Sequence, residues 1–121
     1  MMVKQLKAHW VTIPEQWKIL YHAGGVITSN FLVALFMASV RIYQQLGISK
    51  VEALKILMPL AEKTLAHIKE HGPKDALTGP ASRGDFKTIQ AHRKALLQLD
   101  PELEKMYNVM TQICSNSKRS E

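Results

Sequence analysis

Residues Ile19–Val40 read ILYHAGGVITSNFLVALFMASV, a stretch without a single carboxylate, lysine or arginine. It is long enough either to span a bilayer or to form the central helix of a helical domain. Polar residues and a glycine pair interrupt it at His22, Gly24, Gly25, Thr28, Ser29 and Asn30. These interruptions favour a buried central helix over a membrane span, so the sequence predicts no membrane partner.

The helix that contains this stretch has recognisable ends. Its predicted start is Ile13-Pro14-Glu15, with proline at the first helical position and a carboxylate in the first turn. The helical pattern continues to Leu46, and Gly47 predicts its end. Such a helix would be roughly 50 Å long at the standard rise per residue. The glycine pair marks a place where it can kink or where another backbone can approach closely.

The rest of the chain predicts three further helices. Ser49 and Glu52 form a capping box before the second helix, and Pro59 is expected to bend or split that helix. Asp85 is the predicted cap of a third helix, and Asp100 with the following Pro101 and Glu102 that of a fourth.

The predicted fold class is therefore all-α. Residues 3–12 form a short mixed segment for which an extended backbone is one interpretation, without convincing strand pairing. The domain organisation follows: a linker-like segment at 1–12, a helical domain at 13–115 and a polar tail at 116–121.

The composition limits the functional classes. A chain of 121 residues with 46% apolar and 21% charged residues fits one soluble domain. The single cysteine, Cys114, excludes an internal disulfide and suits a reducing, cytoplasmic location. The net charge is +6 without a compact basic cluster, which disfavours a nucleic-acid partner and fits an anionic small molecule or an acidic neighbouring domain. No secretory signal is visible at the N-terminus.

A polar stripe runs along the predicted first helix. At about 100° per residue, Lys18, His22, Gly25 and Ser29 fall on one face, with Asn30 on the adjoining face. One interpretation is a cleft in which Lys18 or His22 donates a proton to a substrate oxygen. The other is that Lys18 extends its charge into water at the helix end while His22 and Ser29 bond to neighbouring backbone. The spacing alone leaves both open.

The loop Thr78–Asp85 is the second candidate region. It contains two glycines, a proline and Arg83 between two helical segments. It could hold a carboxylate or phosphate through Arg83 and the N-terminal amides of the third helix. It could also be a plain connection in which Gly79 and Gly84 adopt unusual dihedrals and Asp85 caps the helix.

A histidine pair offers a weaker candidate. His67 and His71 are four residues apart, as metal ligands on a helix can be, but no third ligand is apparent. A solvated helix surface is the preferred interpretation, and no metal site is predicted.

Several motifs in order resemble a known family. They are Tyr21-His22, Ser29-Asn30-Phe31-Leu32-Val33-Ala34-Leu35, Ala53-Leu54, Pro59-Leu60, Gly72-Pro73, Ala76-Leu77-Thr78-Gly79-Pro80 and Arg83-Gly84-Asp85. Together they resemble the C-terminal helical domain of bacterial Rossmann-like oxidoreductases, domain of unknown function 2520. This domain is similar to the C-terminal domains of ketopantoate reductase, pyrroline-5-carboxylate reductase and 6-phosphogluconate dehydrogenase.

The resemblance implies a function and a set of site residues. It implies a dimer in which a Rossmann domain binds NADP and the helical domain closes the active site. By position, His22, Ser29 and Asn30 would face the nicotinamide, with Lys18 one helical turn before His22. A neighbouring substrate loop would comprise Thr78, Gly79, Pro80 and Arg83.

The dinucleotide-binding half has no counterpart in this sequence. A helical domain alone would bind no NADP, because the Rossmann domain holds the cofactor in these folds. The chain would then be an excised or truncated domain, or one completed by a separate Rossmann-domain chain. The leading hypothesis is the substrate-binding and homodimerisation half of a 2-oxo acid reductase of the ketopantoate type. The alternative is a non-catalytic helical dimer or interaction module.

Overall fold

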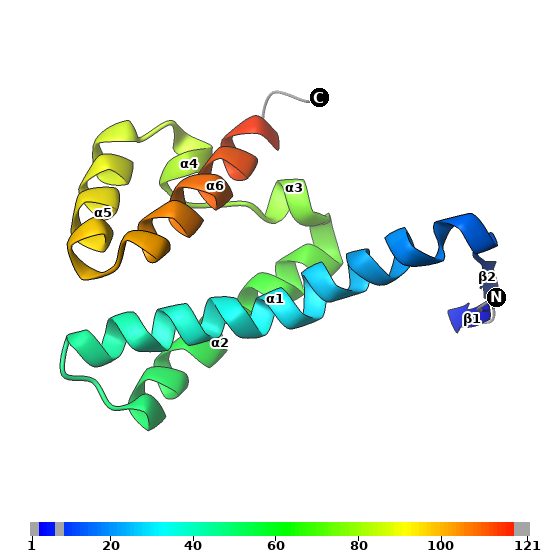
Figure 1. The fold of residues 1–121 in the computed structure, drawn as a ribbon, viewed down its shortest axis with the longest axis horizontal. Helices are drawn as coiled ribbons and strands as arrows, with labels where there is room; N and C mark the ends of the chain where they lie inside the picture. The colour runs from blue at the N-terminus through cyan, green and yellow to red at the C-terminus, as the bar shows by residue number, and fades with distance from the viewer. Residues whose placement is uncertain (1–2, 7–8, 118–121) are drawn as a thin grey trace. The chain divides into compact units, whose positions relative to one another are not determined.

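The computed structural model describes the backbone of residues 3–6 and 9–11 and all of residues 12–117. Helices make up most of these residues, which confirms the predicted all-α class with a long first helix (Figure 1). The chain divides into two compact units, one ending at Leu54 and the other beginning at Lys55. Residues 1–2, 7–8 and 118–121, which include most of the predicted polar tail, lie outside this description.

The first unit begins with a hairpin that the sequence did not predict. Strands β1 (Val3–Leu6) and β2 (His9–Thr12) are antiparallel, with Val3 opposite Thr12 and Leu6 opposite His9. The expectation of no strand pairing in this segment is therefore wrong. The strands are short, and the connection between them lacks the Asn-Gly or Asp-Gly pair that usually indicates a tight hairpin.

The long helix starts in two steps. A short 3₁₀ turn, η1 (Glu15–Trp17), follows Pro14, and α1 (Lys18–Gln45) continues from it. At its end Gly47 takes a φ of 84°, and its N–H donates to the carbonyl of Gln44 at 3.0 Å. The N–H of Ile48 donates to Tyr43 at 3.1 Å, which completes a Schellman cap. The predicted end of the helix at Gly47 is thus confirmed.

The predicted burial of this helix is not observed. No residue of α1, a helix described over its whole length, is buried. Its most exposed large apolar residues are Ile19, at 86%, and Met37, at 67%. The helix is apolar around much of its circumference, and the elements of its own unit are too few to cover it.

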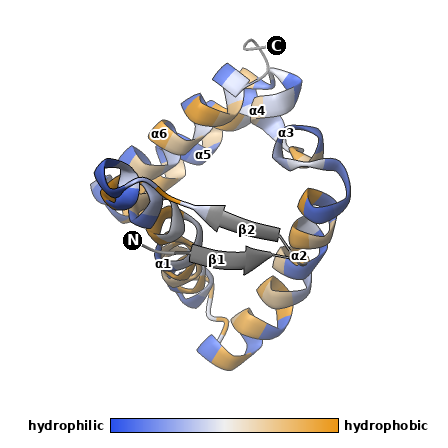
Figure 2. Ribbon diagram, turned by 90° about the vertical axis from the view of Figure 1, so that its right-hand side faces the viewer, coloured by the Kyte–Doolittle hydropathy of each residue, from blue (hydrophilic) through white to orange (hydrophobic). Residues whose placement is uncertain are grey.

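Helix α2 (Lys50–His71) begins in the first unit and continues into the second. The Glu52 N–H donates to the Ser49 hydroxyl at 3.2 Å, which confirms the predicted cap. Pro59 lies inside the helix without ending it, so the expected split does not occur. Hydrophilic and hydrophobic residues alternate along α2 in bands (Figure 2), the pattern of an amphipathic helix.

The second unit continues with four more helices. Two short ones, α3 (Pro73–Ala76) and α4 (Pro80–Arg83), were not predicted. Each follows a glycine and has proline at its start, so the pairs Gly72-Pro73 and Gly79-Pro80 are the sequence signal that could have indicated them.

Helices α5 (Phe86–Leu99) and α6 (Pro101–Ser117) form an antiparallel pair, and α4 packs against both. Asp85 and Asp100 cap them, as predicted. Ile89 of α5 and Leu103 of α6 are buried, each at 7% exposure. Between the two helices, Arg93 Nε donates to Glu104 Oε2 at 2.7 Å. This pair thus holds two buried apolar side chains and an ion pair across its interface.

Candidate functional site

The first candidate site is a pocket at the start of α1, here called the α1 pocket. Its volume is about 320 Å³, and it is lined by Ile13, Lys18, Tyr21, His22 and Gly25. That volume is near the lower limit for small-molecule sites. The predicted neighbours Lys18, His22 and Gly25 therefore meet in one concavity on one face of the helix.

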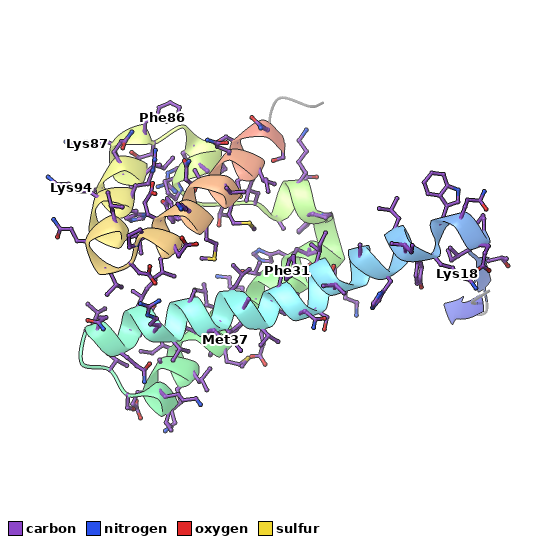
Figure 3. All side chains as sticks on the ribbon, in the orientation of Figure 1. Lys18, Phe31, Met37, Phe86, Lys87 and Lys94 are labelled. Atoms are coloured by element: carbon purple, nitrogen blue, oxygen red, sulfur yellow. The ribbon has the colours of Figure 1, made fainter. Side chains whose placement is uncertain are left out.

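Lys18 is the charged group of this pocket. Its Nζ lies 2.7 Å from Glu15 Oε1, and this ion pair raises the pKa of the ammonium above its usual value. Lys18 therefore stays protonated at neutral pH, which suits holding a carboxylate or carbonyl oxygen. Figure 3 shows it at the start of α1, with Phe31 and Met37 further along the same helix.

Ser29 and Asn30 lie further along α1 than the pocket. Both are exposed, and neither is among its lining residues. At 1.5 Å per residue, Ser29 is about 6 Å along the helix axis beyond Gly25. Tyr21 and Ile13 line the pocket but were not predicted as site residues, although Tyr21 stands beside His22 in the family motif.

The loop Thr78–Asp85 has the geometry of a capped connection. Gly79 has a φ of 98° and Gly84 a φ of 69°, which confirms the unusual dihedrals expected there. The Ser82 hydroxyl donates to the Gly79 carbonyl at 3.1 Å, and the Asp85 N–H donates to the Pro80 carbonyl at 2.9 Å. These bonds hold the turn of α4 closed.

Asp85 occupies the helix end that was a candidate anion cradle. Its Oδ1 accepts from the Thr88 N–H at 3.2 Å and its Oδ2 from the Thr88 hydroxyl at 2.7 Å. These bonds to Thr88, with a smaller contribution from Arg83, lower the pKa of the Asp85 carboxyl. The Phe86 and Ile89 amides donate to backbone carbonyls. The Asp85 carboxylate thus already accepts a hydrogen bond from the N-terminus of α5. A bound anion would find few free amide donors there and would depend mainly on the Arg83 side chain.

Arg83 combines a contact to Asp85 with access to water. Its Nη2 lies 3.6 Å from Asp85 Oδ2, and its side chain is 60% exposed. A guanidinium has five N–H donors in a planar fork, so this contact leaves donors for a ligand carboxylate. The substrate-binding role of Arg83 stays a prediction.

A second pocket, here called the α4–α6 pocket, borders the loop and has a volume of about 230 Å³. The predicted loop residues Thr78 and Pro80 line it, whereas Gly79 and Arg83 do not. Its other walls are Ala81 of α4 and one face of α6, formed by Tyr107, Met110, Thr111 and Cys114. None of these α6 residues was predicted as a site residue from the sequence.

The two sets of predicted site residues belong to different units. Lys18, His22, Ser29 and Asn30 lie in the first, and Thr78, Gly79, Pro80 and Arg83 in the second. That the two sets form one cleft stays a prediction.

The histidine pair of α2 is a surface feature. The rings of His67 and His71 are 6.2 Å apart, edge to face, and both residues are exposed. Among residues 3–6 and 9–117, no group of three or more His, Cys, Asp or Glu residues is arranged to hold a metal ion.

The described residues do not fit a dinucleotide in the Rossmann manner. That mode needs parallel strands and a glycine-rich turn leading into a helix, whereas β1 and β2 are antiparallel and the part of the chain described here shows no such turn.

Helix α1 also meets the length and composition of a membrane-spanning segment, over Glu15–Gln45. None of this segment is buried, so it does not have the burial typical of the core helix of a water-soluble protein. Length and composition alone do not show a membrane span, because a signal sequence passes the same test.

Two solved structures share this fold. A candidate NADP oxidoreductase from Bacteroides fragilis is 27% identical, with a TM-score of 0.73 over 84% of this chain and 37% of its own. A Thermotoga maritima protein is 30% identical, with a TM-score of 0.81 over 90% of this chain and 44% of its own. The present chain thus spans less than half of either relative.

No protein of curated function matches the chain. A family model described as a domain of unknown function, DUF2520, matches residues 1–113, which include the hairpin as well as the helices. The chain therefore belongs to the DUF2520 family, and its helical fold is related to that of NADP oxidoreductases.

Proposed function

We propose that this chain is the substrate-binding and dimerisation domain of an NADP-dependent oxidoreductase. The observation that carries the proposal is the fold shared with the candidate NADP oxidoreductase, at a TM-score of 0.73. A Rossmann domain outside these residues, on the same or a separate chain, would hold the cofactor. The helical domain would contribute substrate contacts, and the enzyme would work in the cytoplasm.

The proposed substrate is a small 2-oxo acid of the ketopantoate type. Lys18 would hold a substrate oxygen, since its pairing with Glu15 keeps it charged. His22, in the same pocket, would transfer the proton, with Ser29 and Asn30 contacting the ligand further along α1. Arg83 would bind the substrate carboxylate beside Thr78, Gly79 and Pro80, because a guanidinium matches a carboxylate in charge and shape.

The apolar surface of α1 supports the homodimer. Met37 and Ile19 are largely exposed, and no α1 residue is buried along its described length. Apolar surface of this kind is stabilised when it is removed from water, at about 25 cal/mol per Å². A second copy of α1 offers a matching surface, and a two-fold interface requires such self-complementarity.

A domain-exchange experiment tests the reductase function. The helical domain of the Bacteroides fragilis relative is replaced by this chain, and NADPH oxidation is measured with ketopantoate. We expect substrate-dependent oxidation that falls about 100-fold or more in His22→Ala, the usual scale for losing a general acid. Arg83→Ala should mainly raise KM, because it removes binding of the carboxylate.

A matched control keeps this result interpretable. His67→Ala removes an exposed histidine of α2 outside both pockets and should leave the rate unchanged. A rate unaffected by both His22→Ala and Arg83→Ala would contradict the site assignment. A folded, NADPH-binding chimera that is inactive with 2-oxo acids would contradict the proposed reaction.

The second candidate function is a non-catalytic dimer or interaction module, which the exposed apolar α1 also favours. The chimera separates the two, since a module would give a dimer with no substrate-dependent NADPH oxidation. Substitutions in the α1 pocket would then change nothing beyond stability.

A further inference from the structure

The α4–α6 pocket has a feature that its predicted loop residues do not explain. Tyr107, on its α6 wall, is hydrogen bonded to His92 of α5, with 2.8 Å between the phenol oxygen and Nδ1. The two rings meet edge to face, with centroids 5.6 Å apart. His92 itself does not line the pocket, so this bond reaches Tyr107 from outside the lining residues.

A second contact joins the same two helices beside this pair. One residue after His92, Arg93 bonds to Glu104 of α6, whose side chain is only 14% exposed. Glu104 precedes Tyr107 by three residues, so both cross-links fix the same turn of α6 against α5. Lys87 and Lys94 point away from α6 and bring no charge to this face (Figure 3).

The pocket itself carries no charge, and most of its surface is apolar, with a few hydroxyl groups among its lining residues. Its polar side chains include Thr78, Tyr107 and Thr111, and none of the described residues that line it carries a formal charge at neutral pH. A carboxylate or phosphate entering it would lose water without meeting a cation, which is costly. A neutral alcohol or ketone would keep its hydrogen bonds.

The pair suits such a ligand in either tautomer of His92. If the phenol donates to Nδ1, its oxygen still accepts from a ligand alcohol; if Nδ1–H donates, the phenol hydrogen is available to a ligand carbonyl. We propose that the α4–α6 pocket binds the uncharged hydroxyl- or carbonyl-bearing end of a small ligand, with Tyr107 as the recognising residue and His92 as its positioning residue.

This inference rests on the proposed function only in taking that ligand to be the substrate of the reductase. The pocket volume of about 230 Å³ is below the usual range for whole ligands. It therefore receives one end of the molecule, and a carboxylate at the other end stays outside.

Direct binding to the full chain tests the proposal without cofactor. Amide chemical shifts are followed by NMR during titration with 2-butanone, 2-butanol and butyrate, which match in size and differ in charge. The two neutral probes should shift residues 78–81 and 107–114 with millimolar affinity, and butyrate should bind there more weakly. Butyrate binding as tightly as 2-butanone would overturn the proposal, as would the absence of neutral-probe shifts in these segments.

Three variants test whether Tyr107 and the pocket wall contact the bound probe. Tyr107→Phe removes one hydroxyl and should weaken 2-butanol binding about two- to twelve-fold, the range for one hydrogen bond. Tyr43→Phe, on α1 in the first unit, is the matched control and should change nothing. Thr111→Val provides a second test of the pocket wall if Tyr107→Phe fails to fold.

Two further variants test the positioning role of His92 through the affinity for 2-butanol. His92→Ala should weaken 2-butanol binding although His92 does not line the pocket, and His92→Gln should restore most of it by replacing the hydrogen bond. Equal binding by Tyr107→Phe and the native chain would refute the recognition role. The titration uses no NADP, so its outcome is independent of the chimera assay. If the neutral probes bind and the chimera is inactive, the binding pocket is supported and only the reductase function is rejected.

Discussion

Helix α1 and the α5–α6 pair differ in how far their apolar side chains are buried. The pair buries Ile89 and Leu103 and adds the Arg93–Glu104 bond across its interface. Helix α1 is longer and more apolar, yet none of its described residues is buried. One region thus has a core of its own, while the other presents surface that a partner would stabilise. We therefore expect a partner to contact α1, and this expectation is independent of any site residue.

Truncating the buried side chains should give the largest effect. Ile89→Ala and Leu103→Ala are each expected to lower the free energy of unfolding by about 2–5 kcal/mol, because they leave cavities between α5 and α6. Urea denaturation followed by circular dichroism measures this. Ile113→Ala, at a position 58% exposed on α6, is the control and should cost about 0.5 kcal/mol or less. Equal losses at Leu103 and Ile113 would mean that the pair has no distinct core.

The two units also use glycine differently. Gly79→Ala should destabilise by about 1–3 kcal/mol, because alanine is strained at its φ of 98°. Gly25→Ala lies inside α1 with open space around the added Cβ, so it should stabilise the helix by about 0.5–1 kcal/mol. Thermal unfolding of both variants tests the signs. Destabilisation by Gly25→Ala without loss of fold would instead indicate that another backbone approaches α1 there.

The partner surface is tested by two substitutions at equally exposed positions. Met37 of α1 is 67% exposed and Phe86 of α5 is 68% exposed. Met37→Glu should weaken the dimer at least about tenfold, since it places a charge in an apolar interface. Phe86→Glu should not. Sedimentation equilibrium gives both dissociation constants, and a larger effect of Phe86→Glu would move the interface to the second unit.

Sequence reasoning succeeded where local chemistry decides the structure. The caps at Ser49, Asp85 and Asp100 and the end of α1 at Gly47 were predicted, because each depends on a few adjacent residues. The continuity of α2 through Pro59 was not predicted, because the stability of the helical turns on both sides exceeds the cost of one lost hydrogen bond.

The candidate site was predictable in part for the same reason. Helical spacing placed Lys18, His22 and Gly25 on one face, and these residues do share a pocket. The wall formed by Tyr107 was missed, because it depends on α6 packing beside α4 and α5, a contact between segments distant in sequence. The hairpin was missed because its connection carries no turn signature.

The smallest expected effect concerns the N-terminal caps of α1 and α5. Helix α5 has Asp85 as a side-chain cap, whereas Trp17 at the start of α1 makes no side-chain cap bond. The pKa of Asp85 is lowered in the folded chain, so its contribution to stability is fully present above the unfolded carboxyl pKa of about 4. That contribution is lost as the pH falls through the lower folded value. Asp85→Asn keeps an acceptor for the Thr88 amide but cannot titrate.

The thermal midpoint measured from pH 7 down to pH 2 should therefore fall less steeply in Asp85→Asn than in the native chain. Asp85→Ala should be less stable than either at pH 7, by a few degrees, because the α5 amide loses its acceptor. Trp17→Ala serves as the comparison at α1 and should leave the shape of the pH profile unchanged, since no titrating cap is removed. An identical acid limb in Asp85→Asn and the native chain would show that the cap acts through its hydrogen bonds alone and not through its charge.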